Sequence, residues 1–193
     1  ELRNPLGAIA SAVEVLQQVH GDAALAANAR QIIARQTRHL ARLMDDLLDV
    51  GRVVSGKVLL QRRPLDLAAL VRNVCAALDV TGESKRHPLR LQTQPVWAEA
   101  DATRIEQVLT NLLGNAFKYT PAGREVRVHL RRVGSLARLD VCDRGDGIDP
   151  SLLPHIFDLF VQGERPLDRR AGGLGIGLTL VRRLVELHDG EVS

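Results

Sequence analysis

In the segment Asn111-Leu-Leu-Gly-Asn115-Ala-Phe-Lys118-Tyr119-Thr120, apolar and polar side chains recur with the spacing of an amphipathic helix. The pattern extends back to Ala102, with Asp101 as the N-cap, and Thr120-Pro121 closes it. It therefore predicts a helix over residues 102–119. The apolar positions that form its buried face are Ile105, Val108, Leu109, Leu112, Leu113 and Ala116.

Another face of this predicted helix is polar at intervals of three and four residues, at Arg104, Gln107, Asn111, Asn115 and Lys118. Asn is a mediocre helix former, and a mid-helix glycine such as Gly114 costs up to ~1 kcal/mol. A helix that accepts these costs presents neutral amide oxygens on one side, and such oxygens suit a hard cation such as phosphate-bound Mg²⁺. A solvated polar stripe is the alternative interpretation.

Two glycine-containing segments follow this helix. The run Asp143-Arg-Gly145-Asp-Gly147-Ile148 ends a predicted strand, where it indicates either a turn or a carboxylate that accepts from a ligand amino group beside a flat ring. The run Gly172-Gly173-Leu-Gly175-Ile-Gly177 leads into a helix predicted over 174–188. Free backbone N–H groups at a helix N-terminus favour anions, although Gly-x-Gly-x-Gly alone discriminates poorly. The run is neither a Walker loop nor a dinucleotide-binding fingerprint.

Residues 1–54 read as two helices with heptad spacing. The first carries Leu2, Leu6, Ile9, Val13 and Leu16, and the second carries Ile33, Gln36, Leu40, Leu43, Leu47, Val50 and Val54. Ile32, Met44 and Leu48 widen the second apolar stripe beyond what one partner helix covers. A dimeric four-helix bundle is therefore expected.

Residues 55–193 mix strands and helices and predict an α+β layer fold. Besides the long helix, a helix is expected over 67–79 behind Asp66, and the final helix over 174–188. Strands are expected at 57–61, 88–94, 96–99, 125–133 and 136–142, and the start of another at 191–193.

Composition excludes several classes of protein. Net charge is +3, the basic residues are interspersed with acidic ones, and aromatic residues make up only 3% of the chain. These features argue against nucleic-acid binding. The apolar runs are too short to cross a bilayer, so no membrane contact is expected for this part of the protein. The two cysteines have neither disulfide nor metal spacing, which favours a reduced, cytoplasmic setting.

The three polar and glycine-containing segments, taken in order with Phe157-Asp-Leu-Phe160 and the opening Glu1-Leu-Arg-Asn4-Pro5-Leu6, resemble sensor histidine kinases of two-component systems. The resemblance covers nearly the whole chain. It implies a dimerisation and histidine-phosphotransfer hairpin over residues 1–54 and an ATP-binding α/β sandwich of the Bergerat type over 55–193, with its last strands beyond the printed sequence. It also implies ATP and Mg²⁺ as cofactors, and a response-regulator receiver domain and a second copy of the chain as partners.

The resemblance further implies roles for individual residues. Asn115 would ligate Mg²⁺, Asn111 would shape the same site, Lys118 would approach the phosphates and Tyr119 would border the nucleotide. Asp143 would accept the adenine amino group, beside Gly145 and Gly147. The phosphates would meet backbone donors at Gly173, Gly175 and Gly177, under a lid formed by about 163–172. Leu174 departs from the family, where Ser or Thr is common.

In the family, the phosphate-accepting histidine directly precedes the acidic residue matched by Glu1, so the acceptor is expected immediately upstream of the printed sequence. These residues alone would then not autophosphorylate. Glu1 would hold or take the histidine ring proton, and Asn4 would position water for dephosphorylation of the partner regulator. Solvent exposure without a role is the alternative for Asn4. The parent protein could carry a membrane anchor.

Two other functions remain open on the sequence. One is a non-catalytic dimerisation and nucleotide-sensing module, whose conformation carries the signal. The other is an ATPase related by fold alone, such as a gyrase-like or chaperone-like protein. The heptad hairpin argues against the second, because those relatives lack that element.

Overall fold

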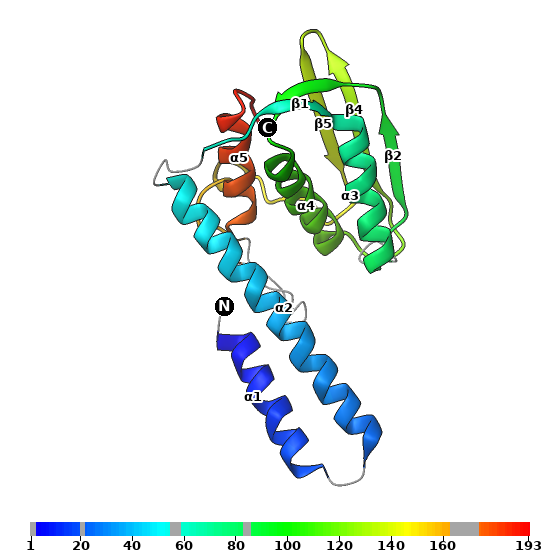
Figure 1. Cartoon of the computed structure of the whole chain (residues 1–193), viewed down its shortest axis with the longest axis vertical. Helices are drawn as coiled ribbons and strands as arrows, with labels where there is room; N and C mark the ends of the chain where they lie inside the picture. Colours follow the sequence, from blue (N-terminus) through cyan, green and yellow to red (C-terminus); the bar gives the residue numbers. More distant parts are fainter. Residues whose placement is uncertain (1–2, 20–21, 55–58, 83–85, 163–173) are drawn as a thin grey trace.

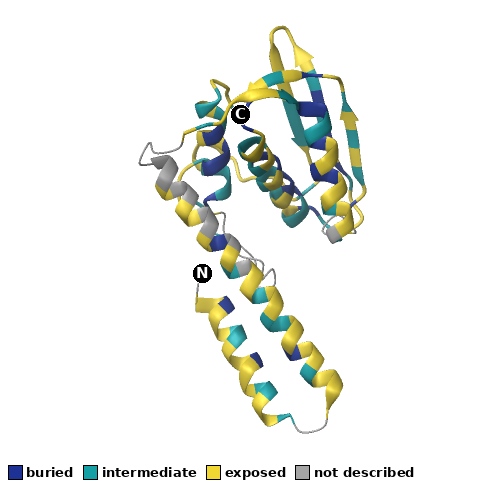
Figure 2. Ribbon diagram, in the orientation of Figure 1, coloured by how far each residue is buried: buried dark blue, intermediate teal, exposed yellow. Residues whose placement is uncertain are grey.

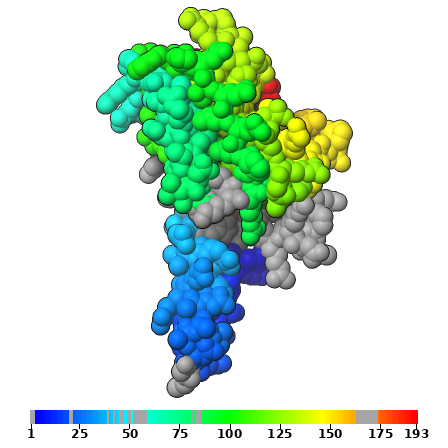
Figure 3. Space-filling model, turned by 90° about the vertical axis from the view of Figure 1, so that its right-hand side faces the viewer, coloured from blue at the N-terminus to red at the C-terminus, as the bar shows by residue number. Residues whose placement is uncertain are grey.

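The computed structural model describes residues 3–19, 22–54, 59–82, 86–162 and 174–193. A long helical hairpin carries a broader α/β unit at one end (Figures 1 and 3). This arrangement confirms the α+β fold class predicted from the sequence. None of the helices described is both long and apolar enough to cross a membrane.

The hairpin consists of α1 (Arg3–Gln18) and α2 (Ala23–Val54), which lie side by side (Figure 1). Asp22 caps α2, because its Oδ1 atom accepts from the backbone N–H groups of Ala24 and Leu25, both at 3.0 Å. Most of the hairpin surface is exposed (Figure 2). That surface includes large apolar side chains, with Leu6, Met44 and Leu48 each more than half exposed. One hairpin therefore leaves part of its apolar stripe uncovered.

The α/β unit contains two small sheets. In the first, β1 (Arg63–Asp66) pairs antiparallel with β3 (Trp97–Ala100). The second has the order β2-β4-β5, in which β2 (Leu89–Thr93) runs parallel to β4 (Val126–Val133), and β4 runs antiparallel to β5 (Leu136–Cys142). Parallel pairing of β2 with β4 requires a long crossover, and α4 lies within it.

Three helices complete this unit: α3 (Leu67–Thr81), α4 (Ala102–Tyr119) and α5 (Gly177–Leu187), and a short 3-10 helix, η1, spans Leu153–His155. α4 lies between α3 and α5 (Figure 1). Leu109 and Leu113 of α4 are fully buried against α3 and the strands, whereas Val108 packs on the α5 side with Leu180 and Leu184. α4 is therefore the element shared by both apolar cores.

The predictions hold closely at α4 and β5 and fail at three places. The strand predicted over 57–61 is wrong: residues 59–61 form none, and β1 begins at Arg63 instead. Pro64 is tolerated there because β1 pairs on one side only. The last helix begins at Gly177 rather than residue 174, since Gly175 has a left-handed φ of 69°. Residues 191–193 form no strand.

Candidate functional site

The polar face of α4 meets the start of α5. Asn111 donates from Nδ2 to the carbonyl oxygen of Gln107 at 3.0 Å, which fixes the orientation of the Asn111 amide. Its Oδ1 atom then lies against Gly177, where an added Cβ would be only 3.0 Å away. One turn later, Asn115 is half-buried, and its side chain makes no hydrogen bond to the described residues. The amide oxygen of Asn111 on α4 thus lies against the first residue of α5.

The start of α5 has the geometry of an anion-binding turn. Its N-cap residue, Ile176, makes no side-chain capping hydrogen bond, so this position does not compete with an anion for the first backbone N–H groups. Thr179 adds a buried hydroxyl without a partner among the described residues. Gly175 is required just before this turn, because an added Cβ would lie 2.8 Å from the carbonyl oxygen of Val161. The Gly175 carbonyl accepts from the N–H of Phe160 at 3.1 Å, which anchors the approach.

The loop after β5 is held against the C-terminal end of α4. The N–H of Gly145 donates to Asp143 Oδ1 at 2.7 Å, and the N–H of Asp146 donates to the carbonyl of Tyr119 at 3.4 Å. A Cβ on Gly145 would lie 2.6 Å from that same carbonyl oxygen. Gly147 has a φ of 78°, which also favours glycine. Asp143 is exposed, and its Oδ2 atom is not used by the loop.

The C-terminal end of α4 carries a cation beside an aromatic ring. Lys118 Nζ lies 5.0 Å from the centroid of the Tyr119 ring, within the range of a cation–π contact. Lys118 also lies in the last helical turn, where a positive charge is favourable. The chain thus brings Asn111 against Gly177, two residues after Gly175, and brings Tyr119, Asp143 and Gly145 together at the C-terminal end of the same helix. No described contact joins the Asn115 side chain to either group, and that of Lys118 contacts only the Tyr119 ring.

Of the described residues expected to act in the reaction, Asn4 stands apart from the others. Asn4 lies exposed in the first turn of α1. Glu1 and Gly173 lie outside the described residues, as does the segment expected to form a lid.

Two parts of the chain match known families in tandem. Residues 1–56 match the His Kinase A (phospho-acceptor) domain, and residues 100–193 match the family of histidine kinase-, DNA gyrase B- and HSP90-like ATPases. A protein of Mycobacterium tuberculosis named "Probable sensor histidine kinase TcrY" is 35% identical over 193 residues, 100% of this chain and 40% of TcrY. This chain belongs to the sensor histidine kinase family.

Solved structures agree with the fold of this sensor histidine kinase. The histidine kinase AdeS of Acinetobacter baumannii aligns with a TM-score of 0.73 and 24% identity, covering 96% of this chain and 85% of AdeS. The histidine kinase ThkA, solved in complex with the response regulator protein TrrA, aligns with a TM-score of 0.69 and 23% identity, covering 98% of this chain and 52% of the matched one. The ATPase family match makes the second domain of this kinase an ATP-binding one.

The residues present suit a nucleotide whose phosphates carry much of the metal coordination. Among the described residues, no group of three His, Cys, Asp or Glu side chains could hold a metal ion. Asn111 offers a neutral oxygen next to the uncapped turn of α5 instead, and Asn115 offers a second one on the next turn of α4. Mg²⁺ retains waters and phosphate oxygens and needs only one or two protein ligands, so this donor set fits the ion.

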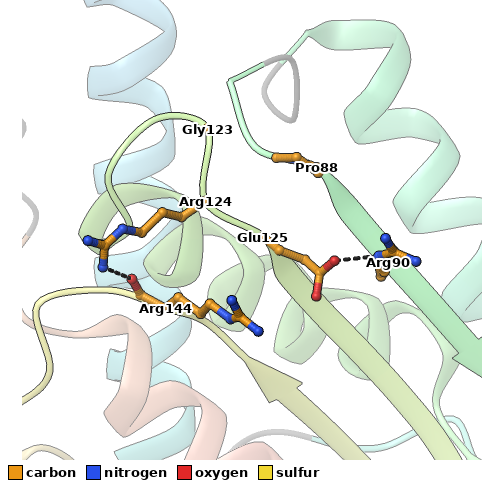
Figure 4. A pocket seen from close by; sticks show the side chains of 6 residues that line it. All are labelled: Pro88, Arg90, Gly123, Arg124, Glu125 and Arg144. Carbon is orange, nitrogen blue, oxygen red and sulfur yellow. Dashed lines mark hydrogen bonds and ion pairs between the residues drawn. The ribbon is translucent and has the colours of Figure 1, made fainter.

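A separate hollow of about 440 Å³ lies outside the Asp143 loop (Figure 4). Its lining comes from the starts of β2 and β4 and from the loop, at Pro88, Arg90, Gly123, Arg124, Glu125 and Arg144. Arg124 donates from Nη1 to the carbonyl of Arg144 at 3.1 Å, and Glu125 pairs with Arg90. None of the expected nucleotide residues lines this hollow. One of its lining residues nevertheless contributes to the candidate site, because Arg124 holds the loop that carries Asp143.

Sequence reasoning missed two contributors to this site. Arg124 follows a turn, and nothing in its local pattern distinguishes it from other surface arginines. Thr179 was signalled only by its place in the first turn after Gly177, where a hydroxyl beside free N–H groups adds a donor.

Proposed function

We propose that this chain is the catalytic core of a sensor histidine kinase, which transfers the γ-phosphoryl group of ATP to a histidine and from there to an aspartate of a response regulator. Residues 1–54 would be the phosphotransfer hairpin and residues 55–193 the ATP-binding domain. The observation that carries the proposal is the approach of Asn111 Oδ1 to Gly177, which joins the amide face of α4 to the uncapped start of α5.

The proposed binding residues lie along the C-terminal half of α4 and on the two segments that contact it. Asp143 accepts from the adenine amino group, while Gly145 and Gly147 let the loop backbone pass close to the ring, and Tyr119 borders it. Backbone N–H groups from Gly175 onward hold the phosphates, with Gly173 belonging to the same run and Lys118 adding positive charge. Asn115, with Asn111 beside it, would hold Mg²⁺, which would supply charge neutralisation for the transferring phosphoryl group.

The histidine acceptor belongs to the hairpin. Its ring nitrogen attacks the γ-phosphorus, the bond to the bridging oxygen breaks, and ADP leaves. The ring proton passes to or is held by the carboxylate of Glu1, which follows the acceptor. Asn4, exposed in the first turn of α1, would orient water when the partner regulator is dephosphorylated. Little covalent work falls to the protein in such a transfer, so positioning dominates.

The hairpin also supplies the proposed partner surface. Leu6, Met44 and Leu48 stay largely exposed in one copy, and a second copy would cover them in a four-helix bundle. The AdeS and ThkA likenesses support the fold of the single chain. The complex of ThkA with TrrA supports a response regulator as the second partner. We propose that residues 1–193 lie in the cytoplasm, as part of a protein that could be membrane-anchored elsewhere, and that they contact neither a membrane nor nucleic acid.

Asn115→Asp tests the metal role. An added carboxylate next to the phosphates repels them, so we expect the full-length variant to lose most acid-labile phosphate labelling from γ-labelled ATP while remaining dimeric. The matched control is Asn73→Asp, an exposed asparagine on α3 outside the site. Unchanged labelling and ATP affinity in Asn115→Asp would refute the metal role. ATP binding without any labelling in the wild-type protein would instead favour the nucleotide-sensing module.

A further inference from the structure

The connection between the hairpin and the ATP-binding domain is tied to the first turn of α4. The backbone N–H of Gln61 donates to Asp101 Oδ2 at 2.9 Å, although the two residues are 40 positions apart. Asp101 is the N-cap of α4, and its Oδ1 atom accepts from the N–H of Arg104 at 3.3 Å. One carboxylate, only 9% exposed, therefore fixes both the connection and the helix that carries the asparagines.

The same connection is tied to the C-terminal end of α5. Arg62 Nη1 lies 2.7 Å from Asp189 Oδ2, and Arg62 Nη2 donates to the carbonyl oxygen of Leu187. An exposed ion pair alone contributes little. Here, however, one guanidinium holds a carboxylate and a C-terminal helix carbonyl together, and its planar fork suits such paired contacts.

His188 connects α4 and α5 directly through hydrogen bonds at both of its ring nitrogens. Its Nδ1 atom lies 2.7 Å from the carbonyl oxygen of Leu184, which can only accept, so the Nδ1–H tautomer donates there. The bare Nε2 atom then accepts from the backbone N–H of Asp101 at 3.0 Å. We call the set Gln61, Arg62, Asp101, His188 and Asp189 the linker clamp.

The linker clamp lies at the opposite end of α5 from the proposed phosphate turn. α4 and α5 run antiparallel, since Asp101 meets His188 while Asn111 meets Gly177. The apolar contacts of Val108 with the α5 core hold the two helices together along their length. α5 also lies beside α2 of the hairpin (Figure 1). The connection is thus fastened to both helices that line the nucleotide site.

We propose that Arg62 and His188 are positioning residues, which fix the connection from the hairpin relative to α4 and α5 and thereby set where the nucleotide lies relative to the phosphate-accepting hairpin. The inference rests on the proposed kinase function. It requires that loss of the linker clamp slow phosphoryl transfer while leaving nucleotide affinity intact, because the apolar contacts still hold α4 against α5.

The test compares four variants of the full-length dimer: His188→Leu, His188→Gln, Arg62→Ala and the control Arg63→Ala. We expect His188→Leu and Arg62→Ala to lower the autophosphorylation rate at saturating ATP at least tenfold, with the Kd for ATP within twofold of wild type. A glutamine Oε1 atom can accept from the Asp101 N–H, so His188→Gln should stay within threefold of wild type. Arg63 is exposed on β1 and outside the clamp, so its variant should match wild type.

Two results would overturn the proposal: rates of His188→Leu and Arg62→Ala equal to the control, or a rise in Kd for ATP as large as the fall in rate. If His188→Leu does not fold, Arg62→Ala decides, since it alters an accessible side chain. If the wild-type protein forms no phosphohistidine, that result counts against the proposed kinase function and not against the linker clamp. Amide hydrogen exchange then tests the linker clamp separately. Exchange at Gln61 should then be at least tenfold faster in Arg62→Ala, and unchanged exchange would refute the clamp.

Discussion

Replacing Gly145 with alanine is expected to weaken ATP binding and destabilise the loop after β5. The new Cβ would lie 2.6 Å from the carbonyl oxygen of Tyr119 and 2.7 Å from Asp143 Oδ1. Carbon and oxygen atoms normally touch at roughly 3.3 Å or more, so the loop must move by about 0.7 Å. The Tyr119 oxygen belongs to the end of α4 and cannot move aside.

The magnitude follows from what that shift breaks. Overpacking costs ~1–3 kcal/mol of folding stability. The shift also disrupts the bond from the Gly145 N–H to Asp143, and with it the placement of the carboxylate. Losing one hydrogen bond between Asp143 and the adenine amino group would cost ~1.5–3 kcal/mol of binding free energy, or roughly a 10- to 100-fold rise in Kd.

Titration calorimetry with Mg²⁺-ATP and urea unfolding would measure the two effects separately. The control is Gly114→Ala, because an added Cβ there meets nothing within 4 Å. That change should raise stability by up to ~1 kcal/mol. Wild-type affinity in Gly145→Ala would refute the adenine role of Asp143, and wild-type stability as well would refute the close contact with α4.

The other predictions concern the cysteines and the hairpin. Burial, and to a smaller extent the charge of Asp79, raise the pKa of Cys75 to about 11. At pH 8 a thiol reagent should therefore modify the exposed Cys142 in the folded protein, and Cys75 only after unfolding. Equal labelling of both cysteines in the folded protein would contradict this. Leu48→Glu should dissociate the dimer in sedimentation experiments, because it places a charge in the apolar stripe of the hairpin. The control Leu59→Glu changes an exposed residue outside the hairpin and should leave the dimer intact. An intact Leu48→Glu dimer would show that the dimer contact does not involve Leu48.

The sequence predicted correctly those helices and strands whose ends are determined by residues adjacent in the chain. α4 spans the predicted residues because the Asp101 side chain caps its start and Thr120-Pro121 ends it. The position of β1 was missed because the sequence around Pro64 resembles a helix start, whereas its pairing depends on β3, more than 30 residues away. α5 was predicted one turn too early, because the left-handed conformation of Gly175 depends on its packing against Val161.

The sequence also indicated the residues of the candidate site but not the tertiary contacts that hold them. Asn111, Asn115, Asp143 and the glycines were identified from residue type and order. The contacts that hold them, such as Arg124 with the Arg144 carbonyl, join segments that only the tertiary fold brings together. The bond between Arg62 and Asp189 spans 127 positions and leaves no periodic or compositional trace.

The N-cap residue of α5, Ile176, has no side chain that satisfies the first N–H groups, and this has a consequence for how the kinase responds to nucleotide. A triphosphate bound there takes the place of the absent cap, so ligand binding itself completes the helix. We therefore expect α5 to fray in the empty protein and to stiffen when ATP is present. The C-terminal end of α5 binds Arg62, in the segment that leads from the hairpin. Nucleotide binding at the start of α5 would therefore also stabilise the junction of the two domains, before any phosphoryl transfer.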